Sequence, residues 1–267
     1  MEFSVLMSLY YKETSSNLDV CIESIYNQSV KPSEIVLVFD GPVSAELENI
    51  VSKWSNYLNI IVHRLDYNVG LGIALNEGLK KCTHEVIARM DTDDICLPDR
   101  FEKQLDAFVK NDCLTVCGSS ILEVEPSSLK IISERRVPLS HNEILRCLPR
   151  KNPFNHMTVM YKKSAVLSAG GYIDHPWMED WSLWVRLLSK GYNGMNLNEN
   201  LVKARTGSAM LMRRSGFRYI KSEWKMFQLL LRYGQVSILK GFLIFIFRST
   251  PRLFPKFLLQ KVYYASR

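Results

Sequence analysis

A short apolar run passes directly into three carboxylates in the stretch Val86-Ile87-Ala88-Arg89-Met90-Asp91-Thr92-Asp93-Asp94. The β-branched and apolar residues over 86–90 predict a buried strand. In open parallel sheets, ligands bind beyond the carboxyl ends of the strands. These aspartates therefore stand at a binding edge if the neighbouring segments also form parallel strands.

The segments around this stretch show the required pattern. Between the β-branched runs, apolar residues recur at helical spacing, which is typical of βαβ units. The pattern predicts a Rossmann-like α/β fold with a mostly parallel central sheet flanked by helices. Further strands are predicted at 3–8, 35–39, 60–63, 114–117 and, facing solvent, 130–137, and a further helix is predicted at 180–190.

Composition and charge divide the 267 residues into two unlike parts. A hydrophobic share of 47% and a charged share of 23% exclude collagen-like, low-complexity and wholly disordered chains. Residues 201–267 contain 14 Lys and Arg and a single acid, Glu223, so they carry a charge of +13, whereas residues 1–200 carry −6. The C-terminal part is therefore expected to meet an anionic surface.

Neither a disulfide framework nor a membrane span is expected. The six cysteines form no CxxC pair. The N-terminus lacks the basic lead-in and the long apolar run of a secretory signal. The longest apolar stretch, Gly241 to Phe247, is far shorter than the roughly 20 residues that cross a bilayer. We expect a protein on the cytoplasmic side, without a signal peptide or a transmembrane span.

The cluster of Asp91, Asp93 and Asp94 is a candidate metal site. Three carboxylates within four residues repel one another unless a cation neutralises them. Magnesium-type ions take one or two carboxylates and fill their other positions with water and phosphate oxygens, so the cluster suits a metal-bound diphosphate. The alternative is a solvated acidic turn before Pro98.

Asp40 follows the predicted strand 35–39 in the same way and would share a rim with Asp91 if the two strands are neighbours. A carboxylate here can hydrogen-bond ribose hydroxyls or a pyrimidine N–H, and Tyr10 or Tyr11 can stack on the base. The alternative for Asp40 is an ordinary turn. The sequence has no GxGxxG or Walker lysine motif, which argues against a dinucleotide or P-loop site.

A second carboxylate pair, Glu179 and Asp180, begins a predicted helix, whose N-terminus favours ionised carboxylates. If this helix end faces the acidic cluster, one of the two acids can take a proton from an attacking hydroxyl, and neighbouring indoles can stack on a sugar. The alternative is Asp180 as a plain N-cap. His156 is either a metal ligand or a histidine hydrogen-bonded in place, and we favour the second interpretation.

Taken in order, the motifs of residues 3–206 resemble a family 2 glycosyltransferase of the bacterial, inverting type that assembles O-antigen or exopolysaccharide repeat units on a polyprenyl diphosphate. The segments that carry the resemblance are Ser4–Ser8 with Tyr10-Tyr11, Asp40-Gly41, Asn68–Leu71, Asp91–Asp94, Pro98–Arg100, Asn152–His156, Gly170–Tyr172 and Glu179–Trp184.

The resemblance implies a GT-A fold and transfer of a hexose, glucose or galactose, from a UDP-sugar to a lipid-linked sugar such as GlcNAc-diphosphoundecaprenol, with a β-linkage formed. Mn²⁺ or Mg²⁺ would bridge the diphosphate, held by Asp93 with Asp91 and Asp94. Asp180, beside Glu179, would be the general base. Asp40 would hold the uracil or ribose, and Asp91 the ribose or donor sugar.

The remaining implied site residues fall on the donor and the acceptor sides. Arg213 and Arg214 would close over the diphosphate, and a solvated or lipid-facing pair is the alternative. The donor set comprises Tyr10, Tyr11, Asp40, Asn68, Asp91, Asp93, Arg100, Arg213 and Arg214, and the acceptor set comprises His156, Trp181 and Trp184. Competing functions are a catalytically silent sugar-nucleotide or lipid-binding scaffold and a metal-dependent phosphohydrolase.

The expected organisation is a catalytic domain over 1–206 and a basic amphipathic helical tail over 207–267. Residues 1–120 would form the nucleotide-sugar half and 121–206 the acceptor half. The tail mixes apolar and basic residues, which predicts a peripheral contact with an anionic membrane, at the cytoplasmic face of the bacterial inner membrane. The alternatives are a helical pair packed on the catalytic domain or a homodimer interface, and the apolar content argues against nucleic acid.

Overall fold

The computed structural model describes residues 1–206 and 216–253. A mixed sheet forms the centre of this described part, with the strand order β3-β2-β1-β4-β8-β6-β9-β5 and with β7 paired to β6. The strands are β1 (Phe3–Leu9), β2 (Glu34–Phe39), β3 (Ile60–Arg64), β4 (Val86–Arg89), β5 (Ile95–Cys96), β6 (Leu114–Val124), β7 (Ile131–Arg135), β8 (Met160–Lys162) and β9 (Asn193–Arg205).

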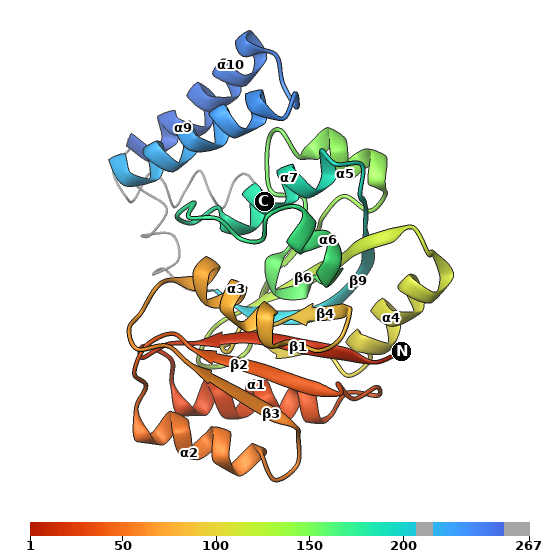
Figure 1. The fold of residues 1–267 in the computed structure, drawn as a ribbon. Coiled ribbons are helices and arrows are strands. Elements are labelled where there is room, and N and C mark those ends of the chain that lie inside the picture. Colours follow the sequence, from red (N-terminus) through yellow and green to blue (C-terminus); the bar gives the residue numbers. More distant parts are fainter. Residues whose placement is uncertain (207–215, 254–267) are drawn as a thin grey trace.

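Helices cover both faces of this sheet and extend from one end of it (Figure 1). They are α1 (Ser15–Tyr26), α2 (Ala45–Trp54), α3 (Leu71–Lys81), α4 (Arg100–Lys110), α5 (His141–Cys147), α6 (Lys163–Ser168), α7 (Glu179–Leu188), α9 (Phe217–Arg232) and α10 (Ile238–Ser249), with short 3₁₀ turns at His156–Thr158 and Thr250–Leu253.

The N-terminal half of the sheet is parallel, as the alternating sequence pattern predicts. β1 pairs in parallel with both β2 and β4, and β2 pairs in parallel with β3. One expectation is wrong in detail, because β1 separates β2 from β4 and the strands that precede Asp40 and Asp91 are not neighbours. Both aspartates still follow the carboxyl ends of parallel strands, so they lie on the same edge of the sheet.

Successive side chains along the central strands point to opposite faces of the sheet, so they contribute to two hydrophobic cores. Val5 and Met7 face one side, where α1 and α2 pack, and Leu6 faces the other, where α3 and α7 pack. The predicted strand 130–137 is confirmed as β7, with Ile131 and Ile132 exposed. The predicted strand 114–117 is the beginning of the longer β6, which pairs with β7, β8 and β9.

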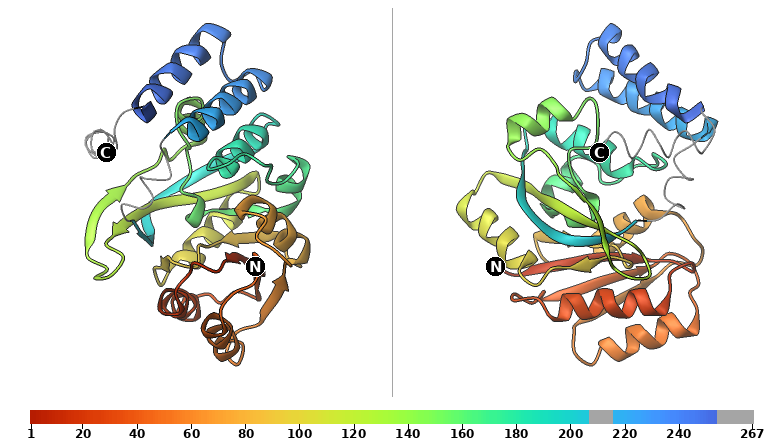
Figure 2. Two further views of the ribbon diagram at one scale, coloured as in Figure 1. Left: turned by 90° about the vertical axis from the view of Figure 1, so that its left-hand side faces the viewer. Right: turned by 180° about the vertical axis from the view of Figure 1, so that it is seen from behind.

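The two helices of the C-terminal part, α9 and α10, form a hairpin that packs on the preceding α/β body of residues 1–206. Tyr219, Met226 and Leu230 of α9 are buried in the core cluster that includes α7. α10 packs against α9, and both helices lie at the end of the molecule opposite α2 (Figures 1 and 2). None of the described helices combines the length and the apolar composition that crossing a bilayer requires.

Candidate active site

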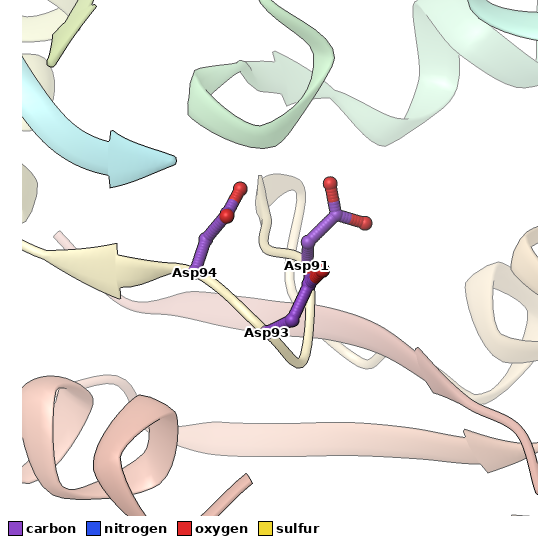
Figure 3. Close-up of side chains that lie close together, drawn as sticks. All are labelled: Asp91, Asp93 and Asp94. Carbon is purple, nitrogen blue, oxygen red and sulfur yellow. The ribbon is translucent and has the colours of Figure 1, made fainter. Parts of the chain in front are cut away.

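The loop after β4 brings three carboxylates together. Asp91, Asp93 and Asp94 each offer an oxygen atom, and these atoms lie within 4.8 Å of one another. The side chains of Asp91 and Asp94 point to the same side of the loop, near the end of β9 (Figure 3). The short connection from β4 to β5 thus concentrates negative charge at the carboxyl edge of the sheet.

Arg89, the last residue of β4, anchors the first of these carboxylates. Its side chain is 2% exposed, and its Nη2 atom donates a hydrogen bond to Asp91. Its Nε and Nη1 atoms have no hydrogen-bond partner among the residues that the structure describes. Because a buried guanidinium needs partners, Arg89 keeps Asp91 in place and retains donors for a further group. The sequence pattern did not single out Arg89, since it reads there as part of a buried strand.

The end of β9 holds the other two aspartates. The backbone N–H of Arg205 donates to Asp94 at 2.9 Å, and the guanidinium of Arg205 donates to the backbone carbonyl of Asp93. Burial, and then the charge of Asp91, raises the pKa of Asp93 to about 7. Burial and the neighbouring charge of Asp93 also raise the pKa of Asp94 well above its usual value. The loop therefore carries unrelieved repulsion between its carboxylates.

This donor set fits a divalent cation. Carboxylate oxygens are the ligands that Mg²⁺ and Mn²⁺ prefer, and a cation replaces the protons that burial otherwise favours. Glu13 adds a further carboxylate nearby, because Thr92 donates to it at 3.1 Å and its charge contributes to the raised pKa of Asp93. Sequence reasoning missed Glu13, which lies in the loop between β1 and α1 and has no motif signal.

Asp40 organises a second loop at the same edge. It is buried, and its carboxylate accepts bonds from the backbone N–H groups of Val69 and Gly70 at 2.6 and 3.1 Å and from the Asn68 side chain at 3.0 Å. These bonds fix the chain just before α3. Three of about four lone-pair sites of the carboxylate are thus used within the protein, which leaves one for a ligand.

α3 in turn positions the start of α7. The side chain of Asn76 donates to the carbonyl of Tyr172 at 2.6 Å and accepts from its N–H at 2.8 Å. Gly171 in this turn has a φ of +62°, and a Cβ atom there would lie 2.6 Å from Asn76 Oδ1. The turn therefore requires glycine, and it directs the chain toward the second carboxylate pair.

The second pair, Glu179 and Asp180, begins α7. The N-cap of α7 is Met178, so the interpretation of Asp180 as a plain N-cap is wrong. The side chain of Asn152 donates to Asp180 and orients its carboxylate. Burial, followed by the charge of Asp180, raises the pKa of Glu179 to about 7, and the charge of Asp91 adds to the rise. The charge of Asp91 is thus close enough to act on Glu179, which places the start of α7 near the acidic cluster after β4.

Three predicted contact residues are buried inside the protein. Arg100 is fully buried and donates to the carbonyl of Arg89 at 2.7 Å, so it supports β4 rather than touching a donor. Trp184 is also fully buried. Trp181 is 3% exposed and donates to the carbonyl of Leu148. Neither indole presents a free ring face to a sugar.

His156 is hydrogen-bonded in place, as the favoured interpretation holds. Its Nε2 atom lies 2.9 Å from the hydroxyl of Tyr172, and burial lowers the pKa of the imidazole well below its usual value. Tyr10 and Tyr11 follow β1 at the edge that carries Asp40, and Tyr11 is 58% exposed. The predicted pair Arg213 and Arg214 lies outside the described residues.

A mixed α/β sheet flanked by helices, with an acidic loop after a parallel strand and a second carboxylate pair near it, is typical of glycosyltransferases of the GT-A type. The sequence matches the model of the family described as "Glycosyl transferase family 2" over residues 4–221, and the chain belongs to this family. Divalent metal ions are typical cofactors of such enzymes, and the cluster after β4 is the matching feature here.

Two curated relatives and one solved structure illustrate the similarity. The "Amylovoran biosynthesis glycosyltransferase AmsE" of Erwinia amylovora is 44% identical over 99% of both chains. The "UDP-Gal:alpha-D-GlcNAc-diphosphoundecaprenol beta-1,3-galactosyltransferase" of Escherichia coli is 38% identical over 95% of this chain and 92% of that protein. The structure of S. aureus TarS 1-349 in complex with UDP-GlcNAc superposes with a TM-score of 0.68 at 20% identity, covering 92% of this chain and 70% of that one.

The raised pKa of Glu179 predicts a pH-dependent gain in stability for Glu179→Gln. The folded-state pKa is about 7 against a usual 4.5, so ionisation of Glu179 destabilises the folded protein as the pH rises through this interval. The free energy of unfolding of the variant is expected to exceed that of the wild type by about 1–3 kcal/mol at about pH 8 and to equal it at about pH 4. Urea denaturation without added metal measures this, with the exposed Glu102→Gln as the matched control. An equal effect of Glu179→Gln at both pH values would contradict the assignment.

Proposed function

We propose that this glycosyltransferase moves a hexose from a UDP-sugar to a polyprenyl-diphosphate-linked sugar, such as GlcNAc-diphosphoundecaprenol, in the assembly of an O-antigen or exopolysaccharide. The observation that carries the proposal is the acidic loop at the end of β4, whose Asp91 interacts electrostatically with Glu179 at the start of α7. The names of the two curated relatives, which concern amylovoran and a lipid-linked GlcNAc acceptor, support this substrate class.

In the proposed reaction, Asp180 takes the proton from the acceptor hydroxyl while that oxygen attacks the anomeric carbon. Asn152 holds the carboxylate of Asp180 by a donated hydrogen bond, and the N-terminus of α7 favours its ionised form. The bond to the UDP oxygen breaks as the new glycosidic bond forms on the opposite face. One displacement inverts the anomeric centre, so an α-linked donor gives a β-linked product.

As the bond breaks, the departing UDP gains a further negative charge on its β-phosphate, which the protein must offset. Asp93, with Asp91 and Asp94, would hold a divalent ion, and this ion when bound supplies the positive charge that stabilises the departing UDP. The guanidinium of Arg89, which donates to Asp91 and has two nitrogen atoms without a partner among the described residues, adds a positive charge at this site. We assign the uracil or ribose to the edge formed by Asp40 and Tyr10.

A product assay tests the proposal. The protein is incubated with UDP-glucose, UDP-galactose and their N-acetyl forms, each with a synthetic GlcNAc-diphosphate lipid, in Mn²⁺, in Mg²⁺ and in chelator. We expect mass spectrometry to show one added hexose on the lipid, from one donor, in the presence of metal. Release of free sugar to water would support a phosphohydrolase. Binding of UDP-sugar without turnover would support the silent scaffold.

We also assign the enzyme a peripheral position at the cytoplasmic face of the inner membrane, because a polyprenyl-linked acceptor is embedded in a bilayer. The charge of +13 carried by residues 201–267 supports an anionic membrane as the partner. The described part of this segment forms the α9–α10 hairpin, which packs on the catalytic body through α9. The alternative of packing on residues 1–206 therefore holds for α9. In the part of the chain that the structure describes, the outer side of α10 is exposed.

A further inference from the structure

α10 is apolar on both of its sides, although the other residues that the structure describes cover just one of them. The inner side packs on α9 so closely that a Cβ atom on Gly241 would lie 2.9 Å from the ring of Phe227. The opposite side consists of residues that are each 45–80% exposed, namely Ile238, Leu239, Phe242, Leu243, Ile246 and Phe247. We call this stripe the outer face of α10. A helix that is apolar all round is normally buried, so the outer face needs a cover.

The charge around the outer face indicates what that cover is. The single acid in the hairpin, Glu223, is buried and paired with Arg248 at 2.7 Å. Within the described residues 216–252, the charged side chains that stand exposed are all positive: Arg218, Lys221, Lys225, Arg232 and Lys240. A second copy docked through a twofold axis would bring these cations toward their own copies. An exposed apolar stripe on a hairpin whose exposed charges are all positive instead matches the headgroup region of an anionic bilayer.

The hairpin is fixed to the helix that carries the proposed base. The guanidinium of Arg248 donates to both oxygens of Glu223 and, at 2.6 Å, to the carbonyl of Arg150. It also lies 4.4 Å from the ring centroid of Trp181, the residue after Asp180. Contact of the outer face with a surface would therefore set the orientation of α7 relative to that surface.

We propose that the outer face of α10 inserts into the headgroup region of an anionic membrane and lies in its plane. This contact would present the start of α7 to an acceptor anchored in the same leaflet, and that consequence rests on the proposed function. Membrane binding itself depends only on the outer face and on the surrounding cations.

Vesicle flotation tests the contact without any substrate. The full chain is mixed with vesicles of phosphatidylcholine alone or with phosphatidylglycerol, and the double variant Leu243→Glu/Phe247→Glu is compared with the wild type. We expect the wild type to float with the anionic vesicles and the variant to bind at least about tenfold more weakly. Val109→Glu, which changes an exposed valine on α4, is the matched control and should bind as the wild type does.

Two further readouts separate the outcomes. Turnover of a long-chain acceptor in vesicles should fall in the double variant, whereas turnover of a short, water-soluble acceptor should not change. Vesicle binding by a protein that transfers no sugar would leave the membrane contact standing and overturn the proposed function. Equal flotation of wild type and variant would overturn the membrane contact. So would a dimer of the wild type in light scattering that the double variant converts to a monomer, since the cover would then be a second copy.

Discussion

Asp180→Asn is expected to lower kcat by about 10³-fold and to leave the affinity for UDP unchanged. Asparagine has the same shape and keeps an oxygen atom that can accept the bond from Asn152, so the helix start should be undisturbed. It cannot accept a proton from the acceptor hydroxyl. Initial rates with saturating donor and acceptor measure kcat, and titration calorimetry measures UDP binding.

Glu179→Gln is the matched control for this variant, because it changes the adjacent carboxylate in the same way. We expect it to lower kcat much less than Asp180→Asn does. If Asp180→Asn keeps kcat within about threefold of the wild type, another group removes the proton and the assignment of the base is wrong. A large loss in Glu179→Gln alone would transfer the role to Glu179.

Asp93→Asn is expected to lower kcat/KM by at least about 10²-fold and to raise the Mn²⁺ concentration needed for half-maximal rate. The same change removes one of the mutually repelling charges of the loop, so the folded protein should become no less stable. Loss of activity without loss of stability would show that the carboxylate serves chemistry. Rates over a Mn²⁺ titration, together with thermal unfolding, measure both effects.

Asp106→Asn controls for the removal of a carboxylate, because Asp106 is exposed on α4 and pairs with Lys110 at 3.6 Å. Its rate and its Mn²⁺ dependence should equal those of the wild type. An Asp93→Asn variant that keeps both the wild-type rate and the wild-type Mn²⁺ dependence would contradict a metal role for this residue. If Asp93→Asn loses its fold together with its activity, Asp93→Glu provides the test, because it keeps the charge and should retain metal dependence.

Local sequence pattern was sufficient for the parallel half of the fold. β1 to β4 and the helices between them follow from the contrast between β-branched runs and helical spacing. The pattern could not give the insertion of β8 between β4 and β6, because this antiparallel pairing joins segments far apart in the chain. The position of Asp91 at the carboxyl edge of the sheet was also predictable, because Asp91 directly follows the predicted strand 86–90.

Side chains whose role depends on a distant partner were missed or misassigned. Arg205 meets Asp94 across 111 positions of sequence, and no local pattern marks such a pair. Arg89 ends an apolar strand, and a single charged residue there gives no local signal that it binds Asp91. Trp184 and Arg100 were assigned to ligands from motif neighbourhood alone, but each side chain points into a core. For Trp184 and Arg100, the sequence motif did not show which way the side chain points from its helix.

Titration calorimetry of UDP binding tests the central claim most directly, namely that the acidic loop after β4 binds a nucleotide diphosphate through a divalent ion. Wild-type protein should bind UDP in Mn²⁺, and chelator should weaken this binding by at least about tenfold. Asp93→Asn should bind UDP equally weakly with and without Mn²⁺. If the wild type binds UDP with the same affinity in Mn²⁺ and in chelator, or does not bind it in either, the account is wrong.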